Sequence, residues 1–388
     1  MNKYLCILSI WTGFFVMGFC DLVGISSDYV QQSFNLTPLM TGFLPSLVFI
    51  WFLFLGVPVG GLMNRIGRKN TVFAGLVLTI LAMFLPFIHY TSITCILAFV
   101  LIGIGNTILQ VSLNPLLTNV LDNPKLLTSS LTIGQVVKAL SSLLGPEVIL
   151  LACSFWGDEH WYYCFPLLGC FTILSIFLLM SSRITREASH EGNQSALMKE
   201  TFSLLKDQRV LILFLGIFFV VGVDVSTNFL SSKIMVYKYN WMLDQAKIAP
   251  QVYFFSRTVG ALAGSVFLTR IDSIKYFKVN IIACLLSLFV WYFAGNSWIT
   301  LASVAGVGIF ASSVFSIIYS VALRLFPDRS NEISGLMVTA IAGGGIITPF
   351  IGILASCFDI MAGIWVAVVC TLYLVYCAFK AEKMILHA

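Results

Sequence analysis

Four charged residues stand in the middle of long apolar stretches of the sequence, where ionic groups are rare. Asp21 and Asp224 each follow a glycine-spaced apolar run, and Lys138 and Arg257 lie in two further runs. A charge at mid-membrane costs about 3 kcal/mol or more, so such a residue usually faces a cavity or a partner and marks an ion or proton pathway. We expect at least one of the two aspartates to bind a proton reversibly, because a medium of low dielectric constant favours the neutral acid.

The two basic residues leave two interpretations open. Lys138 and Arg257 balance the two carboxylates, so both aspartates could be held in static ion pairs. Equally, a basic residue could hold the carboxylate of a small solute once its own partner is protonated, which would couple the entry of an anion to that of a proton. The sequence alone does not choose between these interpretations.

Amide side chains extend this polar set along the same apolar stretches. Asn106, Gln110 and Asn114 recur at a spacing of four, which places them on one face of a helix. Amides both donate and accept hydrogen bonds, as recognition of a hydroxyl-rich solute requires; the alternative is that they join helices to one another. We predict a substrate-binding set of Gln110, Asn114, Gln135, Lys138, Asn228 and Arg257.

The composition shows what kind of elements must position these residues. Of the 388 residues, 59% are hydrophobic and 10% charged, against about 25% charged in an ordinary soluble domain. Apolar runs of about 20 residues, each long enough to cross a bilayer as a helix, recur along the whole chain. We predict an all-α membrane protein with twelve transmembrane helices at about 4–27, 38–62, 71–90, 93–120, 128–152, 161–182, 209–232, 246–268, 277–295, 298–323, 333–357 and 360–380.

Basic residues are distributed unevenly between the loops. Only Lys233, Lys238 and Lys247 fall in loops on one side, and all the other loop Lys and Arg residues fall on the opposite side. Because cytoplasmic loops are enriched in Lys and Arg, we expect both termini in the cytoplasm. The net charge of +5 therefore reports topology, and we expect no nucleic-acid partner.

The sequence repeats itself at a constant offset of 203 residues, which indicates two duplicated six-helix bundles. We predict a first bundle at 1–182, a cytoplasmic linker at 183–208 and a second bundle at 209–388, with the copies related by an axis along the membrane normal. The offset superposes Gly13 on Gly216, Asp21 on Asp224, Gly61 on Gly264, Gly103 on Gly306, Gly105 on Gly308, Pro124 on Pro327 and Pro146 on Pro349.

The loop after the second predicted helix carries a recognisable motif. Residues 60–69 read G-G-L-M-N-R-I-G-R-K, which resembles the loop motif G-x-L-x-D-R-x-G-R-K of the major facilitator superfamily. The resemblance implies the major facilitator fold, and Asn64 stands where that family usually has Asp. We predict a gating loop formed by Gly60, Asn64, Arg65, Gly67 and Arg68.

Within that superfamily, three stretches resemble the fucose:proton symporter family. Residues 218–226 are similar to its seventh-helix pattern Y-V-G-x-E-V, residues 306–323 and 335–349 to its tenth and eleventh helices, and Asn114-Pro115 with Gln135 to its fourth and fifth. The resemblance implies proton-driven uptake of a monosaccharide by alternating access, in the inner (plasma) membrane of a bacterium. Two departures, Gln110 for an acid and Lys138 for an amide, make the site more positive, so a sugar acid is an alternative to a neutral sugar.

The sequence also bears on other classes of function. Gly145-Pro146 resembles part of an antiporter motif, so a proton-coupled exporter of organic or drug-like molecules is the alternative function. The sequence shows no Ser/His/Asp set, metal-ligand pattern or phosphate-binding loop, so we expect no enzyme and no cofactor besides the proton. We expect the partners to be a small-molecule substrate, protons and the lipid bilayer, and the protein to be a monomer.

Overall fold

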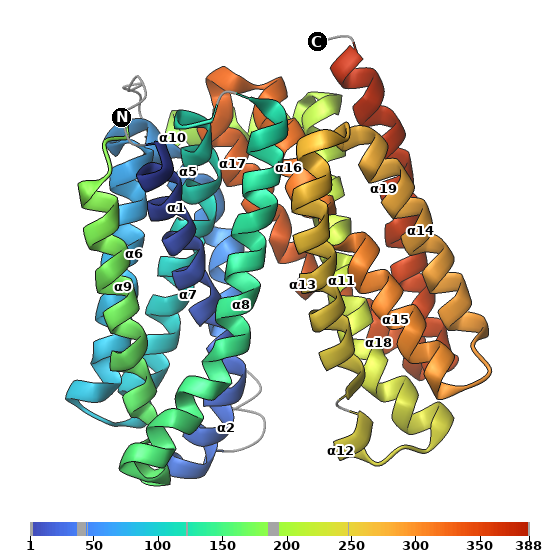
Figure 1. The fold of residues 1–388 in the computed structure, drawn as a ribbon, viewed down its shortest axis with the longest axis horizontal. Coiled ribbons are helices and arrows are strands. Elements are labelled where there is room, and N and C mark those ends of the chain that lie inside the picture. Colours follow the sequence, from blue (N-terminus) through green and yellow to red (C-terminus); the bar gives the residue numbers. More distant parts are fainter. Residues whose placement is uncertain are drawn as a thin grey trace. The chain divides into compact units, whose positions relative to one another are not determined.

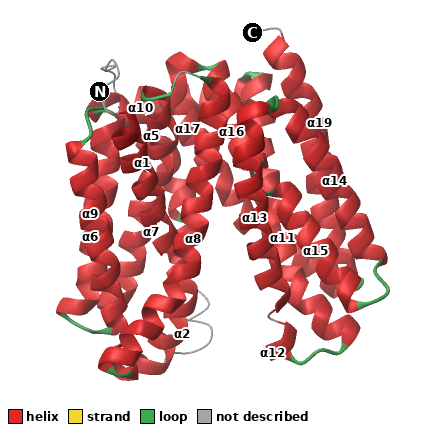
Figure 2. Cartoon of the chain, in the orientation of Figure 1, coloured by secondary structure: helices red, strands yellow, loops and turns green. Residues whose placement is uncertain are grey.

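The computed structural model describes residues 3–36, 44, 46–121, 123–184, 194–246 and 248–386, and the regular elements in this part of the chain are all helices (Figures 1 and 2). Residues 185–193 of the predicted linker and Lys247 lie outside the described residues. The first half contains α1 (Lys3–Met17), η1 (Gly18–Asp21), α2 (Leu22–Phe34), α4 (Ser46–Phe49), α5 (Trp51–Ile66), α6 (Arg68–Ile88), α7 (Ser92–Leu116), η2 (Leu117–Asn119), α8 (Pro124–Trp156), η3 (Asp158–Tyr163) and α9 (Cys164–Ser181). The second half contains α10 (Gln194–Ser203), η4 (Leu204–Lys206), α11 (Gln208–Tyr239), α12 (Leu243–Ala246), α13 (Ile248–Arg270), α14 (Ser273–Phe293), α15 (Ser297–Ala311), α16 (Val314–Leu325), η5 (Pro327–Arg329), α17 (Ser330–Thr339), η6 (Ala340–Ala342), α18 (Gly343–Cys357), η7 (Ile360–Gly363) and α19 (Ile364–Leu386).

The prediction of an all-α membrane protein is confirmed. Among the described residues, ten helices are long and apolar enough to cross a membrane. The other two predicted spans are interrupted: the second is the 16-residue α5, preceded by the short α4, and the eleventh is divided into α17, η6 and α18. Three successive glycines, Gly343 to Gly345, open α18, and glycine lowers the preference of a segment for a continuous helix.

The chain forms two compact units that differ slightly from the two halves of the sequence. The first unit comprises residues 1–122, 134–202 and 329–339, and the second comprises 123–133, 203–328 and 340–388. Each unit thus includes one segment from the opposite half. The predicted boundaries at 182 and 209 concern the duplicated sequence and stay a prediction.

The two exchanged segments obey the 203-residue repeat. Residues 123–133 superpose on 326–336, and α5 superposes on 254–269 within α13. In the first unit α17 packs against α5. In the second unit the start of α8 contacts α13, where the Ser129 hydroxyl donates to the Ser265 carbonyl at 2.7 Å. The same pair of repeat elements therefore meets once in each unit.

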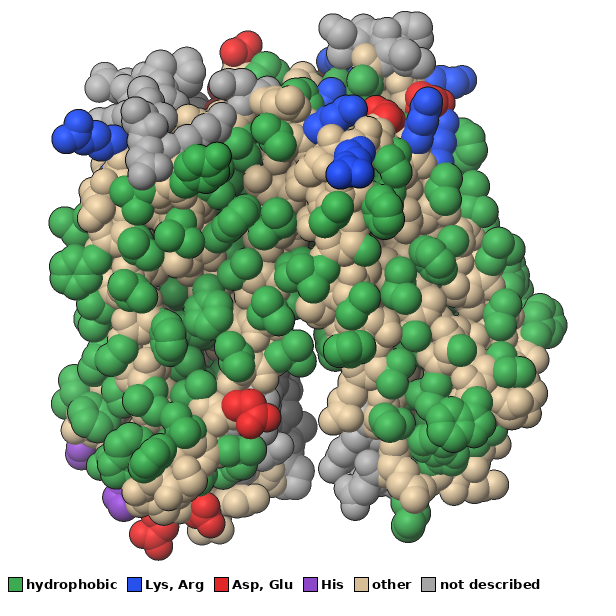
Figure 3. Space-filling view, in the orientation of Figure 1, with side chains coloured by type: hydrophobic (Ala, Val, Ile, Leu, Met, Phe, Trp, Pro, Cys, Tyr) green, Lys and Arg blue, Asp and Glu red, His purple; other side chains and the backbone are tan. Residues whose placement is uncertain are grey.

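The surface of each unit suits a bilayer. Hydrophobic side chains cover the flanks, and the visible Lys and Arg side chains gather at the end of each unit where its chain terminus lies (Figure 3). Large apolar residues such as Phe177 and Phe255 are exposed. In water such exposure would be unfavourable, whereas lipid tails solvate it.

Candidate functional site

Close packing of η1 against α8 determines the position of Asp21. At Gly18 an added Cβ atom would lie 2.5 Å from the Lys138 carbonyl oxygen and 2.6 Å from the Ser141 Cβ, so only glycine allows α8 to approach η1 this closely. Small residues commonly serve this purpose between membrane helices. The carboxyl group of Asp21, at the end of η1, consequently lies next to α8.

The Asp21 carboxylate is held by hydroxyl and thiol groups. The Ser142 hydroxyl lies 2.6 Å from Asp21 Oδ2 and donates to it, and it also lies 3.0 Å from the Lys138 carbonyl oxygen. The Cys20 thiol lies 3.4 Å from Asp21 Oδ1. Cys20 interacts electrostatically with both Asp21 and Lys138, yet among the described ion pairs none joins Asp21 to Lys138. The static pairing considered for these two residues is not present.

Buried amides on α7 lack hydrogen-bond partners. Asn106, Gln110 and Asn114 are all buried, and the Asn114 amide donates to the Gln110 carbonyl at 2.9 Å. Within the described part of the chain, both polar atoms of Asn106, the side-chain oxygens of Gln110 and Asn114, and the Gln135 amide nitrogen have no partner. A buried polar group without a partner is destabilising by about 1–3 kcal/mol, so these groups would gain from a polar partner if the surrounding helices moved to admit one.

In the second unit the equivalent aspartate is in an ion pair. Arg257 Nη1 lies 3.0 Å from Asp224 Oδ2, and the side chains of these residues are 39% and 28% exposed. The hydroxyl of the buried Tyr253 donates to Asp224 Oδ1. Asn228, one turn after Asp224, is exposed. The structure therefore brings Arg257 to Asp224, whereas Lys138 stands apart from Asp21.

The predicted gating loop is a tight turn between α5 and α6. Gly67 has φ 87°, a conformation that favours glycine, and its N–H donates to the Met63 carbonyl at 2.8 Å. This turn starts α6 at Arg68, which is only 8% exposed. Arg65 lies exposed at the end of α5.

Arg68 joins α6 to α17 and to the end of α7. Its Nε donates to Asn331 Oδ1 at 2.7 Å, and its Nη2 donates to the Ser330 hydroxyl. Its Nη1 donates to the Pro115 carbonyl at 3.1 Å and to the Thr118 hydroxyl at 2.9 Å. The planar guanidinium thereby holds three helices of the first unit together.

Asn64 makes the second polar contact between α5 and α17. Its amide donates to Glu332 Oε1 at 2.8 Å, and its Oδ1 accepts from the Asn331 amide at 2.6 Å. Glu332 is 9% exposed. At Gly60 an added Cβ would lie 2.7 Å from the Asn331 carbonyl oxygen. The carboxylate of this contact therefore comes from α17, while the family motif places one at position 64.

Sequence reasoning missed four residues of these clusters. Ser142 lies four residues after Lys138 and Tyr253 lies four residues before Arg257, so helical spacing could have found both. Asn331 and Glu332 carry no such local signal, because their partners on α5 and α6 are more than 260 residues away.

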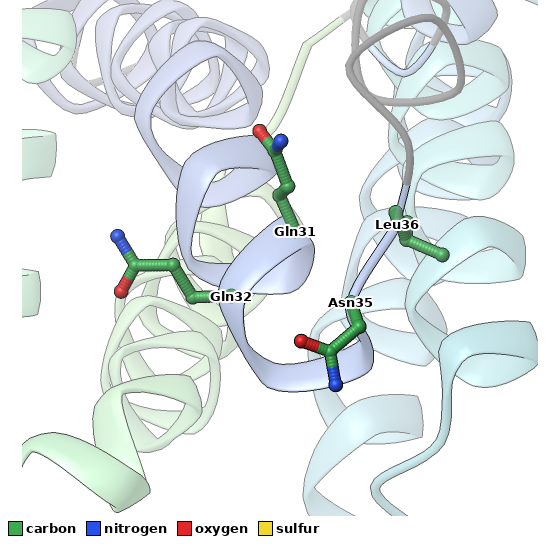
Figure 4. Close-up of a pocket in the computed structure, with 4 residues that line it drawn as sticks. All are labelled: Gln31, Gln32, Asn35 and Leu36. Atoms are coloured by element: carbon green, nitrogen blue, oxygen red, sulfur yellow. The ribbon is translucent and has the colours of Figure 1, made fainter.

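A separate polar pocket lies at the end of α2. It has a volume of about 560 Å³ and is lined by Gln31, Gln32, Asn35 and Leu36 (Figure 4). Asn35 ends α2 in a left-handed conformation with φ 50°. None of the predicted site residues lines this pocket, so it does not identify their ligand.

The family model and the curated relatives that match this chain all describe transporters. The family model of the Major Facilitator Superfamily matches residues 7–349. A glucose/galactose transporter of Brucella abortus is 27% identical over 95% of this chain and 92% of its own, and a putative glucose/galactose transporter of Helicobacter pylori is 25% identical over 95% of both chains.

Solved structures give the same fold at lower identity. The transporter FucP in its outward conformation has a TM-score of 0.84 at 17% identity, covering 97% of this chain and 98% of its own. The proton:xylose symporter XylE has a TM-score of 0.77 at 14% identity, covering 98% and 95%.

Proposed function

Because the chain belongs to the Major Facilitator Superfamily, we propose that it is a secondary transporter that imports a monosaccharide or sugar derivative together with protons. The family and the fold agree with the resemblance found in the sequence, and membership identifies a transporter and not an enzyme. The observation that carries the substrate class is the likeness over 95% of the chain to relatives named glucose/galactose transporters. The unpartnered amides of α7 and α8 support it, because a sugar offers hydroxyls that both donate and accept.

Asp21 is our first candidate for the proton-binding residue. Its carboxylate is exposed and accepts from neutral groups, the Ser142 hydroxyl and the Cys20 thiol. Asp224, in contrast, forms an ion pair with Arg257 and accepts a hydrogen bond from Tyr253. Asp224 is the second candidate, in a role that requires Arg257 to leave it.

We assign a gating role to the contact between α5 and α17. In alternating access the pathway opens on one side of the membrane and then on the other by movement of the two bundles. Helix α17 belongs to the second half of the sequence but packs on α5, which belongs to the first half. We therefore expect α17 to separate from α5 when the pathway opens on the side of the membrane where this contact lies. The hydrogen bonds of Arg68 and Asn64 with α17 would be released in that step.

We place the protein in the inner membrane as a monomer, with both termini in the cytoplasm. The ends of the units that carry the termini are the basic ones (Figure 3), which supports this orientation. The proton is the coupling ion and no cofactor takes part.

The experiment is uptake of radiolabelled neutral sugars and sugar derivatives into proteoliposomes, with and without an inward proton gradient. Accumulation against the sugar gradient only when protons flow inward is the expected result. Facilitated equilibration that ignores the proton gradient would overturn the coupling. Sugar-independent export of organic cations or drugs driven by the gradient would establish the exporter instead.

A further inference from the structure

Lys138 is a half-buried lysine on the spanning helix α8 whose ammonium group has no counter-ion among the residues that the structure describes. Among the described residues, no ion pair or hydrogen bond of its Nζ is present. An unpaired charge in surroundings of low dielectric constant is unfavourable. Such a residue is retained where a ligand of opposite charge pairs with it during the working cycle.

Among the described side chains of the neighbouring helices, none supplies that counter-ion. Helix α2, whose Leu22 lies against Gly145 of α8, also carries Asp28, two turns beyond Asp21. Helices α7 and α9, which pack against α1, contain no Asp, Glu, Lys, Arg or His. The other charged residues of α8 are Lys125 and Glu147, and Glu147 is exposed about 13 Å further along the helix. Asp21 is the acidic residue nearby, and its oxygens accept from Ser142 and Cys20.

The groups around Lys138 fit the remainder of a sugar. Gln135 lies one turn before Lys138 on the same face of α8, and its amide nitrogen has no partner in the described part of the chain. On α7, which packs against α1, the buried Asn106 and Gln110 also have polar atoms without a partner in the described part of the chain. One ammonium with several amides matches a solute that carries one anionic group and several hydroxyls.

We propose that the preferred substrate is a sugar acid, a monosaccharide bearing a carboxylate, and that Lys138 binds this carboxylate. The inference rests on the proposed function and narrows it. A neutral hexose would leave the ammonium without a counter-ion in the loaded state. A hexuronate gives it a charge-assisted hydrogen bond, which is about twice as strong as a neutral one.

The charge count gives this proposal a distinct energetic signature. With one proton on Asp21 and one carboxylate at Lys138, the substrate and the proton together carry no net charge. Their uptake would respond to the pH gradient and not to the membrane potential. A neutral sugar entering with one proton would carry one positive charge inward and would respond to both.

The test is proteoliposome uptake of radiolabelled glucuronate, galacturonate, glucose and galactose under an inward proton gradient. Each substrate is measured at zero potential and under a potassium–valinomycin potential, negative inside. We expect the acids to be preferred by a factor of about 10 or more, and their uptake to be unchanged by the potential. Lys138→Met should lower the apparent affinity for the acids about 10- to 100-fold, as expected for loss of a charged hydrogen bond, and Lys138→Arg should retain most of it.

Controls separate this inference from the proposed function. Lys233→Met removes a lysine of similar burial on α11 and should leave the preference for acids unchanged. If the neutral sugars accumulate and the acids neither accumulate nor compete, the inference is wrong and the proposed function stands. If none of the four accumulates, the inference is wrong, and uptake of the wider panel of sugars described above decides the proposed function. If Lys138→Met does not fold, as judged by size-exclusion chromatography, the wild-type preference and its response to potential decide the question.

Discussion

Asp21 and Asp224 occupy equivalent positions in the repeat, yet their surroundings differ. The first accepts hydrogen bonds from a hydroxyl and a thiol, and the second forms an ion pair with Arg257 and accepts from Tyr253. Among the described ion pairs, one holds Asp224 and none holds Asp21, so no cation has to leave Asp21 before it can exchange a proton. Both copies of the repeat therefore carry the acid, but with different hydrogen-bond and ion-pair partners.

This difference predicts the effect of Asp21→Asn. The amide cannot bind and release a proton, so accumulation driven by the proton gradient should be abolished. Exchange of labelled for unlabelled substrate, which needs no net proton movement, should persist. Both are measured in the same proteoliposomes, with Glu147→Gln as a control that removes an exposed carboxylate from α8. Unchanged accumulation with the wild-type pH dependence would contradict the role of Asp21.

At Asp224 the prediction concerns stability first. Tyr253→Phe removes the hydroxyl that donates to the carboxylate, and a hydrogen bond of this kind contributes about 1 kcal/mol. Arg257→Ala should destabilise the protein more, because it leaves Asp224 without its cation, although partial exposure of both side chains to solvent reduces the effect. Melting temperatures of the purified variants in detergent measure which variant loses more stability. If Arg257→Ala is as stable as the wild type, the ion pair does not contribute to stability.

At the scale of elements, α17 supplies the acid that the family motif places on α5. Asn64→Asp would restore the motif but set a second carboxylate about where the Asn64 amide now meets Glu332 at 2.8 Å. We expect this variant to weaken the α5–α17 contact, since like charges at this distance repel, and to reduce uptake. Adding Glu332→Gln should recover most of the loss.

A double-mutant cycle of these two changes measures the coupling directly. The thermal stability and uptake of Asn64→Asp, Glu332→Gln and the double variant are compared with the wild type. Equal losses in Asn64→Asp with and without Glu332→Gln would mean that the two side chains do not interact in the working protein.

Local sequence signals predicted the elements better than the contacts between them. Long apolar runs and the distribution of basic loops were enough for the spans, because each signal is contained in one helix. The motif at 60–69 identified the turn at Gly67, since its glycine is required by φ 87°. The breaks at η1 and η6 were missed, because hydrophobicity alone does not report where a helix departs from regular geometry.

The roles of the predicted site residues stay predictions, and the structure bears only on their positions and contacts. Placing Asp21, Lys138, Asp224 and Arg257 within spans needed no structure. The pairing of Arg257 with Asp224, and its absence between Lys138 and Asp21, depends on how helices are turned toward one another, which spacing does not determine. The partners of Arg68 and Asn64 lie on α17, beyond the reach of any local pattern.

At the scale of the whole molecule, two adjacent glycines test the proposed cycle. A Cβ added at Gly60 would lie 2.7 Å from the Asn331 carbonyl oxygen, whereas at Gly61 it would meet nothing within 4 Å. Gly60→Ala should therefore hinder the packing of α17 on α5, slow transport and raise access of water-soluble thiol reagents to a cysteine placed at Ser334. Gly61→Ala is the matched control and should behave as the wild type. Equal uptake and labelling in both variants would argue against gating at this contact.

Because each unit includes a segment from the opposite half of the sequence, the order of synthesis determines when a unit can be completed. The first unit is complete only when residues 329–339 have been added, about 200 residues after its first segment ends at 122. At elongation rates of about 5–20 residues per second this interval is about 10–40 s. During that time α5 and Arg68 have been made but α17, the helix that they contact, has not. The first unit can therefore be completed only after most of the second half has been made.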